Sequence, residues 1–247
     1  MKTIKRYHRP ETLDEALRLV NRQDVRTAVI GGGTSLAASA ADDLDEMVDL
    51  QQTGLDNIDE EDGLLNAGAT VRLQDLADFI GTPALLRQAC YFEGPNTIRN
   101  AATLGGVIAS ADGESELLAA LLVYQAQLVI QNGQGRQELS LATFFHDKDP
   151  LLQGAIITEM RLPTGGRSAA ARVARTPADR PIVAAAGRVS PRGKLFIALC
   201  GCGERPALVD PAALDDLPYP ADFRGSSAYR REMAGILVRR VREELGA

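Results

Sequence analysis

Residues 29–36 read VIGGGTSL and place three consecutive glycines, Gly31, Gly32 and Gly33, directly after a β-branched run. Glycine lets the backbone curve sharply and lets several N–H groups point at one spot, as they do in loops that surround a phosphate. A tight turn that merely connects a strand to the next element needs the same residue type. The motif alone is compatible with a turn or with a phosphate site, and only other features of the sequence can distinguish the two.

The composition limits the class of protein. The chain has 247 residues, of which 45% are hydrophobic, and a formal net charge of −6, which suits a globular protein with one large or two to three small domains. An acidic surface does not attract nucleic acid or anionic lipid. No apolar run approaches the roughly 20 residues that span a bilayer, and the N-terminus becomes polar too early for a signal peptide. We expect a cytoplasmic protein that binds no nucleic acid and does not insert into a membrane.

Few side chains suit metal binding or acid–base catalysis. Cys90, Cys200 and Cys202 lack the spacing of a zinc or redox site, so we expect them to be buried apolar residues. The two histidines, His8 and His146, are too few for a histidine metal centre or a serine triad. We therefore expect no catalytic residue and no metal ligand, and any chemistry should belong to a bound cofactor.

The N-terminal part of the chain predicts a small α/β unit. Thr12 and Glu15 form a capping box ahead of a helix expected over 13–22. Strands are expected at 26–30, running into the glycines, and at 47–50.

The middle of the chain predicts helices and hairpins around a long irregular segment. A hairpin is expected over 55–68, followed by two short helices, the second of which begins at Thr82. The first carries an apolar face formed by Leu73, Leu76, Ala77 and Ile80. Residues 92–114 are rich in small and polar residues and are expected to be a loop, and a loop of this length is usually functional. A buried helix over 114–123 and a hairpin over 126–139 should complete the unit.

The C-terminal part predicts an antiparallel sheet covered by a helix. Four strands are expected, at 155–163, 168–176, 181–190 and 194–203. The proline-rich residues 204–226 show no period and are expected to be a linker. The last helix, which begins at Ser227, should face the sheet with Tyr229, Met233, Ile236, Leu237 and Val241.

A second glycine motif lies about 70 residues after the first, and the pair resembles one family. GGGTSL at 31–36 resembles the A-G-G-T-S-L loop of the FAD-binding medium subunit of carbon monoxide dehydrogenase and its xanthine dehydrogenase relatives, the molybdenum hydroxylase family. TIRNAATLGGVIASA at 97–111 resembles their I-R-N-x-A-T-I-G-G-N-I-A-x-A segment. The stretches YHRPETLDEAL, IITEMRLP, ARTPADRPIVAAAG and GSSAYRREMAGILVRRV extend the likeness nearly from end to end.

This resemblance implies an α+β fold. Two small α/β subdomains, expected at 1–53 and 54–150, would form a vanillyl-alcohol-oxidase-type FAD-binding fold, followed by a C-terminal antiparallel sheet with helices at 151–247. The implied cofactor is FAD. The implied partners are an iron–sulfur small subunit and a molybdenum-cofactor large subunit, with electrons passing from the clusters through FAD to an external acceptor. The organic substrate would react on the large subunit.

The two glycine motifs supply the expected FAD contacts. A net-acidic chain can hold a diphosphate only through local donors, such as the N–H groups of consecutive glycines and neighbouring hydroxyls. The first motif lacks the third glycine of a G-x-G-x-x-G fingerprint, so an NAD-binding Rossmann site is a weaker alternative. The candidate cofactor-binding residues are Ile30, Gly31, Gly32, Gly33, Thr34, Ser35, Leu36, Thr103, Leu104, Gly105, Gly106, Ser110, Glu116 and Arg172.

Some positions depart from the family pattern. Val107 stands where the family has asparagine and cannot reproduce its side-chain hydrogen bond. Glu116 replaces an aspartate that bonds the ribose, and Arg172 replaces a lysine, so both could still bind or could be solvated structural residues. Arg99 is expected to anchor the second motif. The chain is also shorter than typical members, which leaves open a second function, a flavin-free scaffold subunit that joins the iron–sulfur and molybdenum subunits.

Overall fold

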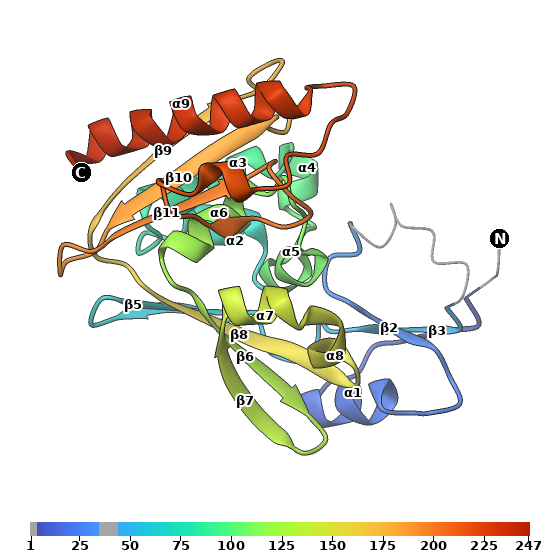
Figure 1. Cartoon of the computed structure of the whole chain (residues 1–247). Helices are drawn as coiled ribbons and strands as arrows, with labels where there is room; N and C mark the ends of the chain where they lie inside the picture. The colour runs from blue at the N-terminus through green and yellow to red at the C-terminus, as the bar shows by residue number, and fades with distance from the viewer. Residues whose placement is uncertain (1–3, 35–43) are drawn as a thin grey trace.

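The computed structural model describes residues 4–34 and 44–247, and it confirms a mixed α and β fold (Figure 1). The first unit is a parallel sheet with the order β1-β3-β2, built from β1 (Arg6–His8), β3 (Glu46–Asp49) and β2 (Thr27–Ile30). Helix α1 (Leu13–Val20) begins after Thr12, whose hydroxyl accepts a backbone N–H at 3.2 Å, so the predicted cap is confirmed. The helix buries Ala16 and Leu17.

The second unit is an antiparallel sheet with the order β4-β5-β8-β6-β7. Its strands are β4 (Ile58–Glu61), β5 (Leu64–Gly68), β6 (Gln127–Asn132), β7 (Gly135–Ser140) and β8 (Ala155–Pro163). Both predicted hairpins, β4–β5 and β6–β7, are present.

Strand β8 lies in the middle of this sheet, although the sequence predicted it as the first strand of the C-terminal sheet. It pairs with β5 on one side and with β6 on the other. Each hairpin leaves one inner edge of N–H and C=O groups that needs a partner, and β8 satisfies both edges. The assignment of 155–163 to the C-terminal sheet is therefore wrong. The domain limits 1–53, 54–150 and 151–247 remain predictions.

Short helices fill the space between this sheet and the C-terminal part of the molecule. They are α2 (Leu73–Asp78), α3 (Ala84–Phe92), α4 (Asn96–Arg99), α5 (Leu104–Ser110), α6 (Glu116–Val123), α7 (Leu141–His146) and α8 (Lys148–Leu152). All eight residues of α6 are buried, as its apolar sequence predicted. The cysteines Cys90, Cys200 and Cys202 are buried free thiols, also as predicted.

Two expectations for this region are wrong. Residues 92–114 are not one long loop, because they contain α4 and α5. Thr103 is the N-cap of α5: its hydroxyl accepts the N–H of Gly106 at 3.3 Å, which gives the glycine-rich segment a helical start. Ile80 does not lie on an apolar face, because α2 ends at Asp78 and leaves the Ile80 side chain 92% exposed.

The C-terminal sheet has the antiparallel order β12-β11-β10-β9. Its strands are β9 (Arg167–Val173), β10 (Val183–Val189), β11 (Leu195–Cys200) and β12 (Ala207–Leu208), and η1 (Leu214–Asp216) follows. Helix α9 (Ser227–Leu245) lies across this sheet (Figure 1). The contact is close, because a Cβ at Gly187 on β10 would lie 2.3 Å from Val241 on the helix.

The buried face of α9 is rotated relative to the prediction. Leu237 and Val241 are buried as expected, whereas Tyr229 and Met233 are only partly buried. The other buried residues are Arg230, Ala234, Val238 and Leu245. Apolar periodicity could not identify this face fully, because it includes an arginine.

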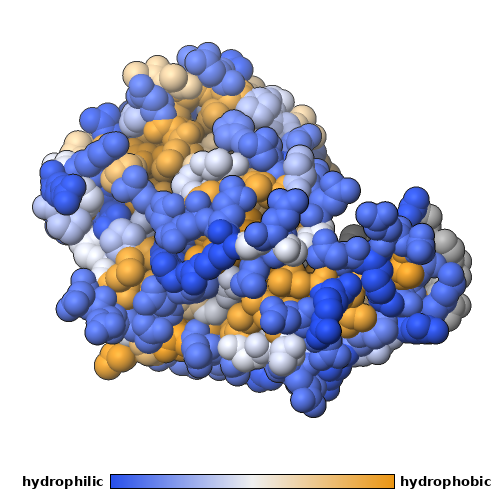
Figure 2. All heavy atoms as spheres, turned by 90° about the horizontal axis from the view of Figure 1, so that it is seen from below, coloured by the Kyte–Doolittle hydropathy of each residue, from blue (hydrophilic) through white to orange (hydrophobic). Residues whose placement is uncertain are grey.

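The molecular surface is mixed in hydropathy. Seen from below, hydrophilic residues cover much of the face, with several patches of hydrophobic residues between them (Figure 2). In the residues that the structure describes, no helix has both the length and the apolar character needed to cross a membrane.

Candidate functional site

The two glycine segments meet at a cleft of about 780 Å³ between the first unit and α5. The first segment follows β2, and the second forms the N-terminal part of α5. Eight of the predicted site residues line this cleft: Ile30, Gly31, Gly32, Gly33, Thr34, Thr103, Gly106 and Ser110. Two others, Ser35 and Leu36, lie outside the described residues. The sequence therefore identified the principal walls of the cleft.

Gly31 and Gly32 are required by the contact between the two segments. A Cβ at Gly32 would lie 1.8 Å from the carbonyl oxygen of Ala101, and one at Gly31 would lie 2.2 Å from Oγ1 of Thr103. Neither position has room for a side chain, whatever the cleft contains. Gly33 adopts φ +71°, a left-handed conformation that also favours glycine.

The backbone donors of the two segments differ. In the second segment, Leu104 N–H bonds to Val71 O at 2.8 Å and Gly105 N–H bonds to Ala69 O at 2.8 Å. In the part of the chain that the structure describes, no protein acceptor takes the N–H of Gly32 or Gly33. The first segment is thus the one with N–H groups available to an anion.

Gly106 is the open position of the second segment. A Cβ there would have one neighbour among the described residues, Oγ1 of Thr103 at 3.0 Å. By contrast, a Cβ at Gly105 would lie 2.7 Å from the Cβ of Ala69, and Leu104 is fully buried. Gly106 therefore presents bare backbone to the cleft, whereas Gly105 and Leu104 serve the packing of α5.

Ser110 and Val107 also line the cleft. The Ser110 hydroxyl donates to the carbonyl of Val107 at 2.7 Å, so it already has an acceptor within the helix. Arg99 fastens the segment that precedes α5. Its guanidinium donates to Gln74 at 2.9 Å and to the carbonyl of Gly94 at 2.7 Å, which confirms the expected anchor role.

Glu116 and Arg172 pair with each other and do not line the cleft. Arg172 Nε lies 2.8 Å from Glu116 Oε1, and its guanidinium lies 4.1 Å above the Phe92 ring. Arg172 also donates to the carbonyl of Pro177 at 3.0 Å. Burial raises the pKa of Glu116, although Arg172 acts in the opposite direction. A ribose contact by Glu116 remains a prediction, and in this arrangement its carboxylate already has a partner.

Three charged residues of the cleft wall were not predicted from the sequence: Glu93 after α3, Asp112 after α5, and Arg180 between β9 and β10. Arg180 Nη1 lies 3.1 Å from Asp112, and its Nη2 lies 3.7 Å from Glu93. Glu93 and Asp112 flank the second glycine motif. Their position beside a glycine-rich segment could have marked them in the sequence as candidate residues of the site. Nothing in the sequence connected Arg180 to them.

The comparisons with known proteins identify the family. Residues 2–165 match the family model described as the FAD binding domain in molybdopterin dehydrogenase, and the chain therefore belongs to this family. It is 32% identical over 250 residues to the uncharacterized protein YgfM of Escherichia coli K12, with 95% of this chain and 94% of that protein covered. It is 24% identical over 276 residues to the glyceraldehyde dehydrogenase medium chain of Sulfolobus acidocaldarius, with 97% of both chains covered.

The fold is also that of a solved structure. A chain of the carbon monoxide dehydrogenase of Hydrogenophaga pseudoflava superposes with a TM-score of 0.87 at 22% identity, covering 99% of this chain and 98% of that one. The family match confirms FAD as the cofactor and an oxidoreductase component as the class of protein. The site residues themselves remain predictions.

Proposed function

We propose that the chain is the electron-transfer subunit of a molybdenum hydroxylase complex, in which FAD accepts electrons from iron–sulfur clusters of a partner and passes them to an external acceptor. The cleft at the junction of the two glycine segments is the observation that carries this proposal. It offers the backbone N–H groups of Gly32 and Gly33, which have no protein acceptor among the described residues, beside the open backbone of Gly106.

The residues of the cleft fit a diphosphate with an attached flat ring. The N–H groups of Gly32 and Gly33 would donate to phosphate oxygens, a contact that an acidic protein can make without a cationic side chain. The Thr34 hydroxyl is a further donor at the end of that segment. Apolar side chains on the cleft wall, Ile30, Leu73, Ile98 and Val107, would exclude water from a ring. FAD supplies the redox chemistry when it is bound.

The proposed partners are an iron–sulfur small subunit and a molybdenum-cofactor large subunit. The Sulfolobus relative is named as a medium chain, and the Hydrogenophaga enzyme is described as lacking one moiety of its molybdenum cofactor. A medium chain implies a smaller and a larger companion. Co-purification of this chain with a molybdenum-containing subunit would support the assignment, and purification as a free, stable flavoprotein with no companion would argue against it.

The flavin itself can be tested directly. The purified chain should be yellow and should release FAD, not FMN, on heating, because the junction of the glycine segments suits a diphosphate that FMN lacks. The released flavin can be identified by chromatography. A colourless chain that also fails to take up added FAD would favour the second candidate, a flavin-free scaffold between the two partner subunits.

A further inference from the structure

Glu93 has an unusual position for a carboxylate. Its side chain is 6% exposed and lines the cleft. One carboxylate oxygen, Oε1, accepts hydrogen bonds from Ser115 Oγ at 2.6 Å and from the Leu117 N–H at 3.2 Å. Among the described residues no hydrogen-bond donor reaches the other oxygen, Oε2, whose contact with Arg180 is long, at 3.7 Å. Glu93 thus has one oxygen fixed by α6 and one left for a group in the cleft.

The positive charge near Glu93 is too widely shared to neutralise an ionised Glu93 side chain. Arg180, the cation that faces it, is shared with Asp112 at 3.1 Å and with Glu114 at 4.0 Å. Glu116, on the adjoining helix α6, adds a further carboxylate, although Arg172 pairs with it.

Two buried thiols complete the surroundings. Cys90 on α3 and Cys200 on β11 both experience the charge of Glu93, and burial raises the pKa of both thiols, which keeps them protonated. Neither can offset the Glu93 charge. Burial accordingly raises the pKa of Glu93, even though Arg180 and the hydrogen bond from Ser115 act in the opposite direction.

A ligand in the cleft increases this effect. It displaces water from the wall on which Glu93 lies, and removing water disfavours the ionised form of a carboxyl group further. A ligand with a diphosphate is itself anionic, so a neutral carboxyl group is the better neighbour. A neutral carboxyl group also carries a hydrogen that can be donated to an acceptor atom of the ligand.

We propose that Glu93 binds the cofactor as a neutral carboxyl group that donates a hydrogen bond from Oε2, so that flavin binding takes up one proton. This inference rests on the proposed function and adds a ligand contact that neither glycine motif contains. The conservative amide variant, Glu93→Gln, retains a hydrogen-bond donor and cannot ionise. It should therefore resemble the protonated state at every pH.

The test is the FAD dissociation constant of the apoprotein between pH 5.5 and 8.5, measured by flavin fluorescence. The wild-type constant should rise with pH, by up to tenfold per unit once Glu93 is ionised in the free protein. Glu93→Gln should bind within about threefold of the wild-type value at low pH, and its affinity should not change with pH. Glu159→Gln, a half-buried glutamate on β8 paired with Arg161, is the control and should keep the wild-type pH profile.

Calorimetry in two buffers of different ionisation enthalpy counts the protons directly. Wild-type protein should take up close to one proton per FAD at the upper end of the pH range, and Glu93→Gln should take up none. This count on wild-type protein decides the matter even if the variant does not fold. Weak binding by a folded Glu93→Gln variant at every pH, or a flat wild-type profile with tight binding, would overturn the inference alone. Absence of FAD binding at all pH values would overturn the proposed function as well.

Discussion

Packing within the chain requires a glycine at position 32. A Cβ there would meet the Ala101 backbone, so its absence reflects the contact between two segments, and a substitution would separate them. Gly106 differs, because its neighbour is a single hydroxyl and its open side faces the cleft. Loss of flavin in a Gly32 variant would therefore report packing, while loss in a Gly106 variant would report contact with the ligand.

The adjacent glycines of α5 separate these two causes. Gly106→Ala should weaken FAD binding at least tenfold, about 1.4 kcal/mol, because the methyl group occupies space at the cleft. It should leave the melting temperature unchanged or slightly higher, since alanine favours a helix over glycine by roughly 0.5–1 kcal/mol. Gly105→Ala should instead lower stability by about 1–3 kcal/mol through overpacking against Ala69.

Thermal melts and flavin titrations of the two variants provide the measurement. Gly105→Ala, where folded, should bind FAD like the wild type. If Gly106→Ala also binds FAD with full affinity, the cofactor does not approach this face of α5.

At the scale of elements, the proline-rich residues 204–226 are more than a linker. Tyr219 in this segment is fully buried, its hydroxyl donates to the carbonyl of Leu214 at 2.7 Å, and its N–H donates to the carbonyl of Cys202 at 3.0 Å. These contacts fix the segment against the C-terminal sheet. The segment shows no periodic signal in sequence, because it is held by separate contacts of β12, Tyr219 and Asp222 and not by a repeating face.

Tyr219→Phe tests this attachment through pH. Burial raises the pKa of Tyr219 to about 12, so the folded state holds the phenolic proton more tightly than the unfolded state. Wild-type stability should fall as the pH rises from 10 toward 12. The variant should be about 1 kcal/mol less stable at pH 8, from the lost hydrogen bond, and the difference should shrink above pH 10. Urea unfolding at pH 8 and pH 11 measures both, and a difference that stays constant would show that the phenol is not buried.

Elements that depend on residues close together in the sequence were predicted better than elements that depend on distant residues. The cap at Thr12, both hairpins and the buried helix α6 follow from neighbouring residues and were predicted correctly. Helices α4 and α5 have four and seven residues, too few turns for a periodic pattern to appear. The place of β8 depends on two strand edges that lie far from it in sequence.

The residues of the site follow the same rule: local motifs were predictable, and contacts between distant residues were not. The walls formed by the two glycine motifs were predictable, since each motif is local. Arg180 comes from the connection between β9 and β10, and its approach to Glu93 depends on how the C-terminal sheet packs on α6. Glu116 and Arg172 were both selected by resemblance, but that resemblance could not reveal that they pair with each other.

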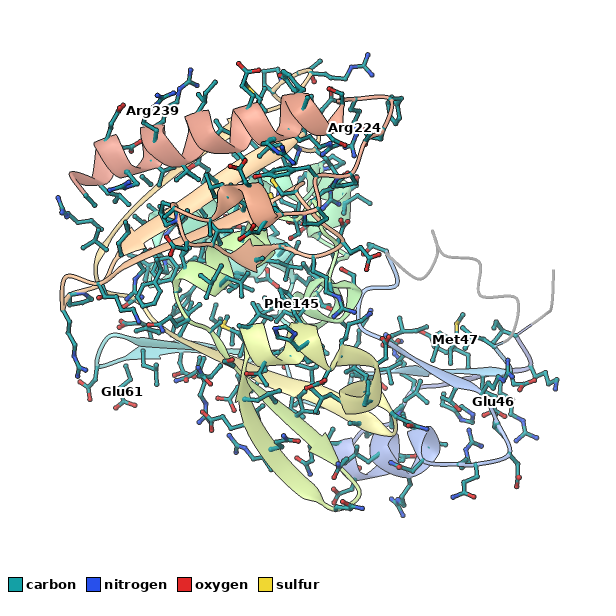
Figure 3. The ribbon with its side chains drawn as sticks, viewed as in Figure 1. Glu46, Met47, Glu61, Phe145, Arg224 and Arg239 are labelled. Carbon is teal, nitrogen blue, oxygen red and sulfur yellow. The ribbon has the colours of Figure 1, made fainter. Side chains whose placement is uncertain are left out.

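At the scale of the whole molecule, a series of ion pairs links the cleft to the C-terminal helix. Arg180 at the cleft reaches Glu114, Arg224 joins Glu114 at 2.9 Å to Asp222 at 3.0 Å, and Arg230 on α9 lies 2.7 Å from Asp222. Arg224 lies just before α9, whereas Arg239 points outward from the helix (Figure 3). Together with the Glu116–Arg172 pair, this network gives polar contacts between the preceding part of the chain and the C-terminal sheet with its helix.

Arg224→Ala should loosen this contact. Removal of a partly buried arginine from two carboxylates should cost about 1–2 kcal/mol, which corresponds to a melting temperature lower by roughly 2–8 °C. Residues 204–226 should also become more sensitive to limited proteolysis. Arg239→Ala, which removes an exposed arginine of α9, is the control and should change neither quantity. Equal effects of the two substitutions would mean that the ion pairs contribute nothing to the contact.

The central position of β8 sets an order of events during biosynthesis. A ribosome completes both glycine segments well before it reaches residue 155, yet the sheet beneath α5 still lacks its middle strand at that moment. Until β8 emerges, the nascent chain carries two hairpins with open edges, the kind of surface that chaperones cover and that aggregates when left exposed. The cleft between the glycine segments therefore forms late in translation, and a chain that stops at residue 150 should be insoluble even though it contains both glycine motifs.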